Sequence, residues 1–152
     1  MYAELHCLSH YSFLRGASAP EELVNRAIHC GYHALAITDE CSLAGVVKAH
    51  VAAKEHNLKL IIGSELTLTE GIRLVALVPD RKAYGELSGL ISRARRRSGK
   101  GEYIVHLRDV IFHLKRCLLI LLPAATDNQS VHLQQLAKRC KGRVWIGISR
   151  LL

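Results

Sequence analysis

The sequence predicts an α/β fold with mainly parallel strands and surrounding helices. Short apolar runs bounded by turn residues recur at 34–38, 58–62, 118–122 and 144–148, and segments with apolar residues at helical spacing lie between them. Alternation of this kind favours a largely parallel sheet covered by helices. At 152 residues the chain is long enough to bury a substantial core, and we expect one domain over residues 1–152.

The expected strands follow the apolar runs. A first strand, which carries His6, is expected over 2–8, and the next two cover 34–38 and 58–62. Glu70-Gly71 lies between apolar segments at 65–68 and 72–78, which predicts a hairpin. The run at 118–122 stops at Pro123, and a last strand is expected over 144–148.

Helices are expected between these strands. They cover residues 19–30, 43–55, 81–95, 107–114 and a segment that Thr126 or Asp127 caps and that ends near 139. Ser18 is the expected N-cap of the first helix, Asp80 that of the third, and Gly16 is expected to supply a turn conformation. In the second helix the expected inward positions are Val46, Val47, His50 and Val51. In the last helix the expected apolar positions are Val131, Leu133, Leu136 and Ala137.

Composition narrows the class of protein. The five cysteines form no C-x-x-C pair, which argues against a zinc knuckle or a disulfide framework and favours a reducing, cytoplasmic setting. Apolar runs stay far below the roughly 20 residues of a membrane span, so no membrane partner is expected. The sequence also contains no G-x-S-x-G elbow and no phosphate-binding G-x-x-x-x-G-K-[ST] loop.

The net charge is +8, and part of the excess is concentrated in one cluster. That cluster consists of Arg93, Arg95, Arg96, Arg97 and Lys100. It has two interpretations. It can contact nucleic acid, or it can compensate the negative end of a helix dipole and remain solvated.

Polar side chains follow three consecutive predicted strands. They are His6 with Ser9 and His10, Asp39 with Glu40, and Glu65 after Gly63-Ser64. Because carboxyl ends of parallel strands share one edge of a sheet, these groups can assemble a metal site or an acid–base site, with Asp39 and Glu40 as catalytic candidates. Imidazole and carboxylate ligands suit zinc or manganese. Alternatively, Asp39 caps the next helix and the histidines have no functional role.

Three ordered blocks resemble the PHP (polymerase and histidinol phosphatase) domain. ELHCLSHYSFLRGAS at 4–18 resembles its opening, and AITDECSLAGVV at 36–47 and IIGSE at 61–65 match the second and third blocks. These three blocks most resemble the version of the domain at the amino terminus of bacterial C-family DNA polymerase III alpha subunits. Within these, they most resemble the error-prone branch.

The resemblance implies a distorted (β/α)7 barrel with metals at the carboxyl ends of its strands, of which this chain is a partial, N-terminal portion. His6 matches the first histidine of the H-x-H block, and Leu8 replaces the second. Asp39 matches the aspartate of the T-D-H block, with Glu40 in place of the histidine, and Glu65 matches the glutamate ligand. The later ligand blocks would fall beyond residue 152. We therefore expect a degraded site that holds neither Zn nor Mn tightly.

The functional expectation is a PHP-domain portion of an error-prone polymerase alpha subunit that is itself structural. The parent would carry out damage-tolerant DNA synthesis in replication and repair, with DNA and other polymerase or translesion subunits as partners. An incomplete barrel would leave edges uncovered, which favours self-association. One alternative is a metal-dependent phosphoesterase or 3'-5' nuclease that uses His6, His10, Asp39, Glu40 and Glu65. Another is a plain nucleic-acid or protein binding module.

Overall fold

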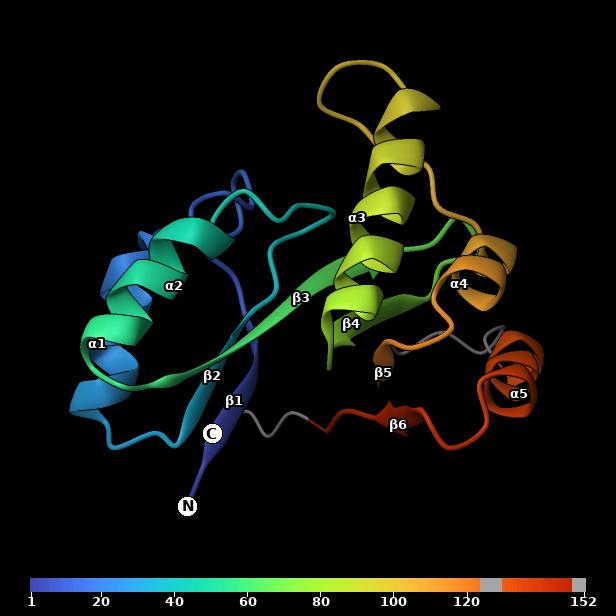
Figure 1. The fold of residues 1–152 in the computed structure, drawn as a ribbon. Coiled ribbons are helices and arrows are strands. Elements are labelled where there is room, and N and C mark those ends of the chain that lie inside the picture. The colour runs from blue at the N-terminus through green and yellow to red at the C-terminus, as the bar shows by residue number, and fades with distance from the viewer. Residues whose placement is uncertain (124–129, 149–152) are drawn as a thin grey trace. The chain divides into compact units, whose positions relative to one another are not determined.

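A computed structural model describes residues 1–123 and 130–148 of the chain (Figure 1). The chain divides into two compact units, residues 1–65 and 66–152, and each is described by itself. Strands and helices alternate within both units, which confirms the predicted α/β class. In the described part of the chain, no helix has both the length and the apolar character needed to cross a bilayer.

The first unit consists of parallel strands and two helices. Its elements are β1 (Ala3–Cys7), α1 (Pro20–His29), β2 (Ala34–Ile37), α2 (Val46–Glu55) and β3 (Lys59–Thr67), of which the last two residues enter the second unit. β2 pairs in parallel with β1 on one side and with β3 on the other, where Ile37 lies opposite Ile62. The carboxyl ends of β1 and β2 therefore lie at the same edge, beside β3, which continues past Ile62 to Thr67.

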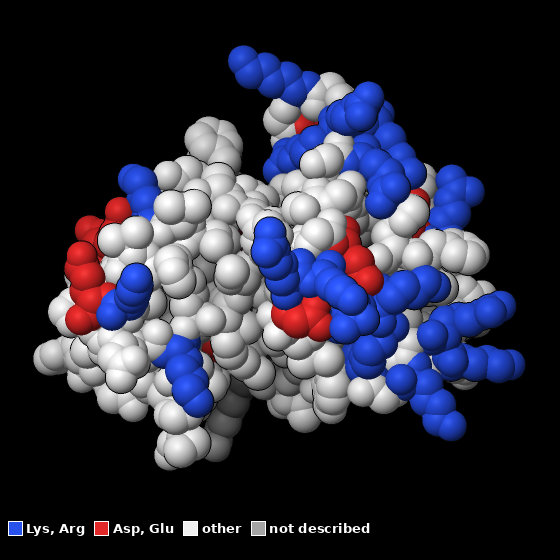
Figure 2. Space-filling model, viewed as in Figure 1, with Lys and Arg blue, Asp and Glu red and all other residues white. Residues whose placement is uncertain are grey.

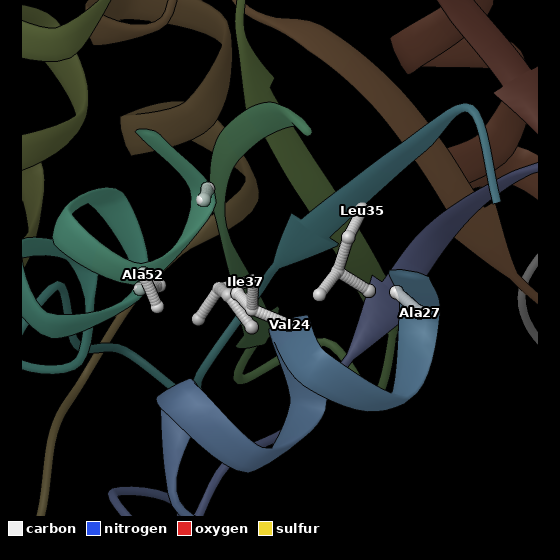
Figure 3. Packing of buried hydrophobic residues seen from close by; sticks show 7 residues of the cluster. Val24, Ala27, Leu35, Ile37 and Ala52 are labelled. Carbon is white, nitrogen blue, oxygen red and sulfur yellow. The ribbon is translucent and has the colours of Figure 1, made fainter. Parts of the chain in front are cut away.

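The core of the first unit lies between β2 and the two helices. Figure 3 shows Val24 and Ala27 of α1 together with Leu35 and Ile37 of β2 and Ala52 of α2. All four residues of β2 are buried, which explains why this strand is an unbroken apolar run in the sequence.

The face of α2 that is buried differs from the predicted one. Val46 is buried as expected, but Val47 and Val51 are 72% and 53% exposed and His50 is also exposed. The positions that pack inward are instead alanines: Ala49, Ala52 and Ala53. Small side chains let α2 lie close to its neighbours. Hydrophobicity alone does not predict this packing, because it ranks valine above alanine.

Two predictions about the first loop and helix were wrong in detail. The N-cap of α1 is Ala19 and not Ser18, and the Glu22 carboxylate accepts the Ala19 N–H at 2.8 Å. Gly16 has no left-handed backbone; a Cβ there would lie 1.9 Å from the carbonyl oxygen of Ser9. Gly16 is therefore required for close approach of two backbone segments, and the left-handed residue of this loop is Leu14, at φ 60°.

The second unit combines an antiparallel and a parallel strand pair with three helices. Its elements are β4 (Arg73–Val78), α3 (Arg81–Arg96), α4 (Leu107–His113), β5 (Leu118–Leu122), α5 (Ser130–Arg139) and β6 (Val144–Ile146). β4 runs antiparallel to β5, and β5 runs parallel to β6. A turn is present at Glu70-Gly71, as predicted, with Gly71 at φ 78°.

The ends of these elements agree only partly with the sequence prediction. Asp80 caps α3, since its carboxylate accepts the Ala83 N–H at 2.8 Å. β6 ends at Ile146, two residues earlier than predicted. On α5 the structure buries Leu136, while Val131 is exposed. The predicted caps of that helix, at 126 and 127, lie outside the described residues.

Candidate functional site

Polar side chains near the carboxyl ends of β1 and β2 meet Glu65, which lies within β3, in the first unit. The chain after β2 continues beside β3, because the Thr38 carbonyl accepts the Glu65 N–H at 3.0 Å and the Glu65 carbonyl accepts the Cys41 N–H at 2.9 Å. This arrangement forms an isolated parallel bridge between Glu40 and Glu65. The two carboxylates are thus brought together by backbone pairing.

Glu65 is the centre of a charged network. Its side chain is fully buried, and its Oε2 lies 2.6 Å from Nε2 of His6. Arg15 donates from Nη1 to Glu65 Oε1 at 2.7 Å and from Nη2 to Oε2 at 3.2 Å. The same Nη1 also donates to Glu40 Oε2 at 2.8 Å. One guanidinium therefore bridges both carboxylates.

The network determines the protonation state of Glu65. Burial raises the pKa of this carboxyl, but the hydrogen bonds and positive charge supplied by His6 and Arg15 outweigh burial and lower the pKa to about 2. Conversely, the hydrogen bond to Glu65 raises the pKa of the Arg15 guanidinium, and Glu40 adds to this effect. Both groups are charged at neutral pH, so the centre is an ion network.

Asp39 lies nearby but faces a different set of partners. Its buried carboxylate accepts the Ser9 N–H at 2.8 Å, the Ser9 hydroxyl at 2.7 Å and the Ser12 hydroxyl at 2.7 Å. The Ser12 Oγ in turn accepts the Glu40 N–H at 2.9 Å. Asp39 therefore holds the loop after β1 in place, and its oxygens are occupied by donors from that loop.

The predicted site residues thus separate into three groups. His6, Glu40 and Glu65 lie together around Arg15, and Asp39 binds the serines of the adjacent loop. His10 is exposed, and its ring lies against Tyr11 with centroids 4.7 Å apart.

The ligand set implied by the family, His6, Asp39 and Glu65, does not fit a divalent metal ion as these residues lie. Both oxygens of Glu65 and both oxygens of Asp39 already accept hydrogen bonds, and a guanidinium lies where the carboxylates converge. Within the described residues, no group of three or more His, Cys, Asp or Glu side chains is arranged to hold a metal. A metal would first have to displace Arg15.

Sequence reasoning placed Ser9 in the polar cluster but missed two other residues that complete this network, Arg15 and Ser12. The available signal was the arginine itself, in the loop that follows the His6 strand. A buried carboxylate requires a positive partner, and Arg15 is the basic residue of this loop.

In the second unit, two members of the basic cluster make internal contacts. Arg97 forms a bidentate ion pair with Asp109, from Nη1 to Oδ2 at 2.5 Å and from Nη2 to Oδ1 at 3.2 Å. The guanidinium of Arg95 lies 5.3 Å from the ring centroid of Tyr103. The remaining members, Arg93, Arg96 and Lys100, are exposed.

A second concentration of basic residues lines a groove of about 820 Å³ between α4 and α5. Its basic lining residues are Arg108, Lys115, Lys138 and Arg139, and Phe112 adds an exposed aromatic ring. Figure 2 shows Lys and Arg side chains gathered over the face that carries α3, α4 and α5. Sequence reasoning did not identify this groove, because its residues come from separate helices.

The chain belongs to the PHP domain family, whose model matches residues 4–139. Among curated relatives, it is 57% identical over 152 residues to the error-prone DNA polymerase of Saccharophagus degradans, 50% identical over 151 residues to that of Teredinibacter turnerae, and 52% identical over 152 residues to that of Dechloromonas aromatica. These alignments cover 99%, 99% and 97% of this chain but 15% of each relative. The chain therefore matches the PHP region of a much longer type of protein.

Solved structures share the fold. A putative metal-dependent phosphoesterase from Bifidobacterium adolescentis superposes with a TM-score of 0.73 at 17% identity, covering 96% of this chain and 76% of that one. An amidohydrolase from Chromobacterium violaceum gives a TM-score of 0.68 at 16% identity with the same coverage. At these identities the likeness establishes the PHP-type fold and nothing about the reaction.

Proposed function

We propose that this chain is the N-terminal PHP region of an error-prone DNA polymerase and serves there as a structural module. The observation that carries the proposal is the identity of 50–57% along almost the whole chain to proteins of that name. The geometry of the centre supports a structural role, because Arg15 occupies the position between the carboxylates where a catalytic cation would act.

The parent protein, on this proposal, performs DNA-directed DNA synthesis in the cytoplasm and tolerates damaged templates during replication and repair. Its nucleotidyl-transfer residues belong to the remainder of the longer protein, since the chain spans about 15% of the relatives it matches. DNA is the substrate of the parent, and other polymerase or translesion subunits are its partners.

Primer extension tests this proposal. The complete reading frame that contains this chain is expressed, and the product is assayed on an undamaged template and on a template with an abasic site. We expect nucleotide incorporation on both templates. A complete product that is purified folded and incorporates no nucleotide on either template would overturn the proposal.

The alternative is a metal-dependent phosphoesterase or nuclease, which the juxtaposition of His6, Glu40 and Glu65 favours. Its test is Mn²⁺-stimulated hydrolysis of a chromogenic phosphoester or of a 3'-labelled oligonucleotide by the chelator-washed chain. Turnover that His6→Asn abolishes would support this alternative. We expect none, since Arg15 holds the same carboxylates.

Direct contact of this chain with DNA is a separate proposal that rests on the groove between α4 and α5. Lys138 and Arg139 lie on the same helix and line the groove together with Arg108 and Lys115. Filter binding of duplex DNA across a range of salt concentrations tests it, because each phosphate contact adds roughly 0.9 to the salt slope. The double variant Lys138→Glu/Arg139→Glu should flatten that slope, whereas Arg93→Glu/Arg96→Glu reports on the exposed part of the basic cluster.

A further inference from the structure

The centre at the strand ends has the charge pattern of a cation site with the cation built into the chain. Two carboxylates, Glu40 and Glu65, converge on one nitrogen, Nη1 of Arg15, at 2.8 and 2.7 Å. The imidazole of His6 completes the group through Glu65. The Glu65 side chain has no exposed surface, so its charge needs a partner inside the protein.

We propose that the Arg15 guanidinium is the resident cation of this centre and takes the place of a divalent metal ion. A corollary is that removal of this side chain uncovers a metal site. The donors left behind are two carboxylates and one imidazole, which are the ligand types that Zn²⁺ and Mn²⁺ take. As they lie, they are not arranged to hold a metal, so these side chains must move together once the guanidinium is gone. The proposal concerns the first unit alone and holds whether or not the chain is part of a polymerase.

Arg15 is positioned by the fold of its loop. The Ser12 carbonyl accepts the N–H groups of Arg15 and Gly16, at 3.0 and 2.9 Å. The loop is also held by the Asp39 carboxylate, which accepts hydrogen bonds from Ser9 and Ser12. The side chain of Arg15 is 31% exposed, and its guanidinium is held in place by the carboxylates of Glu40 and Glu65.

This arrangement gives Asp39 an indirect role. In the family pattern its position is that of a ligand, whereas here its carboxylate binds the loop that carries the cation. Asp39 is therefore a positioning residue for Arg15. Its replacement and that of Arg15 should affect the same centre.

The experiment compares the wild-type chain with Arg15→Met, in chelator and with added Zn²⁺ or Mn²⁺, by thermal unfolding and calorimetric titration. We expect the melting temperature of Arg15→Met in chelator to fall by roughly 10 °C, because a buried carboxylate loses its partner. Metal should restore part of this loss and bind with a stoichiometry of one, while the wild type should show neither effect. Arg93→Met is the control for loss of a surface arginine.

A second variant separates charge from packing. In Arg15→Met/Glu65→Gln the buried charge is gone, so the double variant should melt higher than Arg15→Met in chelator and should no longer respond to metal. Where Arg15→Met alone is too unstable to purify, we expect the double variant still to be recovered folded, because the unpartnered buried charge is gone. Stoichiometric metal in the chelator-washed wild type would overturn the proposal. So would a loss of stability in Arg15→Met that neither metal nor Glu65→Gln relieves.

Discussion

Replacement of Asp39 by asparagine is the sharpest test of how the loop after β1 is held. Oδ1 of Asp39 accepts two hydrogen bonds, from the Ser9 N–H and the Ser12 hydroxyl, and Oδ2 accepts one from the Ser9 hydroxyl. In Asp39→Asn the amide oxygen can keep the first two bonds without the charge, and the amide nitrogen faces a hydroxyl that previously donated. The variant therefore preserves the shape of the site and changes its electrostatics.

The cost follows from these three bonds. A hydrogen bond to a charged group contributes about 1.5–3 kcal/mol and a neutral one about 1 kcal/mol. Loss of the charge at two bonds and a forced reversal of the third predicts a decrease of about 3 kcal/mol in the free energy of unfolding. Asp39→Ala would leave the buried Ser9 N–H without a partner, and its cost approaches the ~5–15 kcal/mol of a whole domain. Asparagine is therefore the informative substitution.

Urea unfolding followed by circular dichroism, in the presence of chelator, measures this decrease. Asp80→Asn is the matched control, because asparagine is as good an N-cap as aspartate and Asp80 is exposed. An Asp39→Asn variant as stable as Asp80→Asn would refute the assigned role. A wild type that loses the same stability on chelation would also refute it, since Asp39 would then act through a metal.

Three further outcomes are expected. Because folding lowers the pKa of Glu65 from 4.5 to about 2, its contribution to the free energy of unfolding is complete above pH 4.5 and is lost as the pH falls toward 2. Unfolding curves recorded between about pH 5 and 3 should therefore show a pH-dependent stability, and Glu65→Gln should weaken that pH dependence. In Gly16→Ala the new Cβ would lie 1.9 Å from a backbone oxygen, so this substitution should lower the free energy of unfolding by more than about 2 kcal/mol. In Gly89→Ala the nearest atom is 3.7 Å away, so the same denaturation assay should show a gain of about 0.5–1 kcal/mol. Asp109→Ala removes the acceptor of the His106 N–H and should lower stability by about 1–2 kcal/mol; a melting temperature unchanged by this substitution would contradict the capping role.

Much of the fold could be predicted because burial dictates the apolar runs of the strands: β2 is buried at all four positions, and β5 alternates buried and half-buried residues. The run at 118–122 became β5 without a change of boundary, and the run at 34–38 became β2 with one residue fewer. The buried face of α2 could not be predicted, because alanines carry a weak hydrophobic signal and their value lies in close packing. The N-cap at Ala19 was missed for a related reason, since the acceptor comes from Glu22 and not from the capping residue.

The candidate site was predictable to the extent that parallel strands place their ends together. His6, Glu40 and Glu65 could be assigned to one edge from strand order alone. The identity of the cation could not be assigned in this way. The position of Arg15 depends on a loop conformation fixed by tertiary hydrogen bonds to Asp39, and such bonds leave no periodic trace in a sequence.

A guanidinium attached to the chain differs from a dissolved ion in its mass action. A bound metal stabilises a fold only as far as its free concentration exceeds its dissociation constant, so the folded fraction follows the metal supply. Arg15 is present at a fixed effective concentration that neither dilution nor a competing chelator lowers. On the proposal made above, the folding equilibrium of the first unit does not follow the metal content of its surroundings.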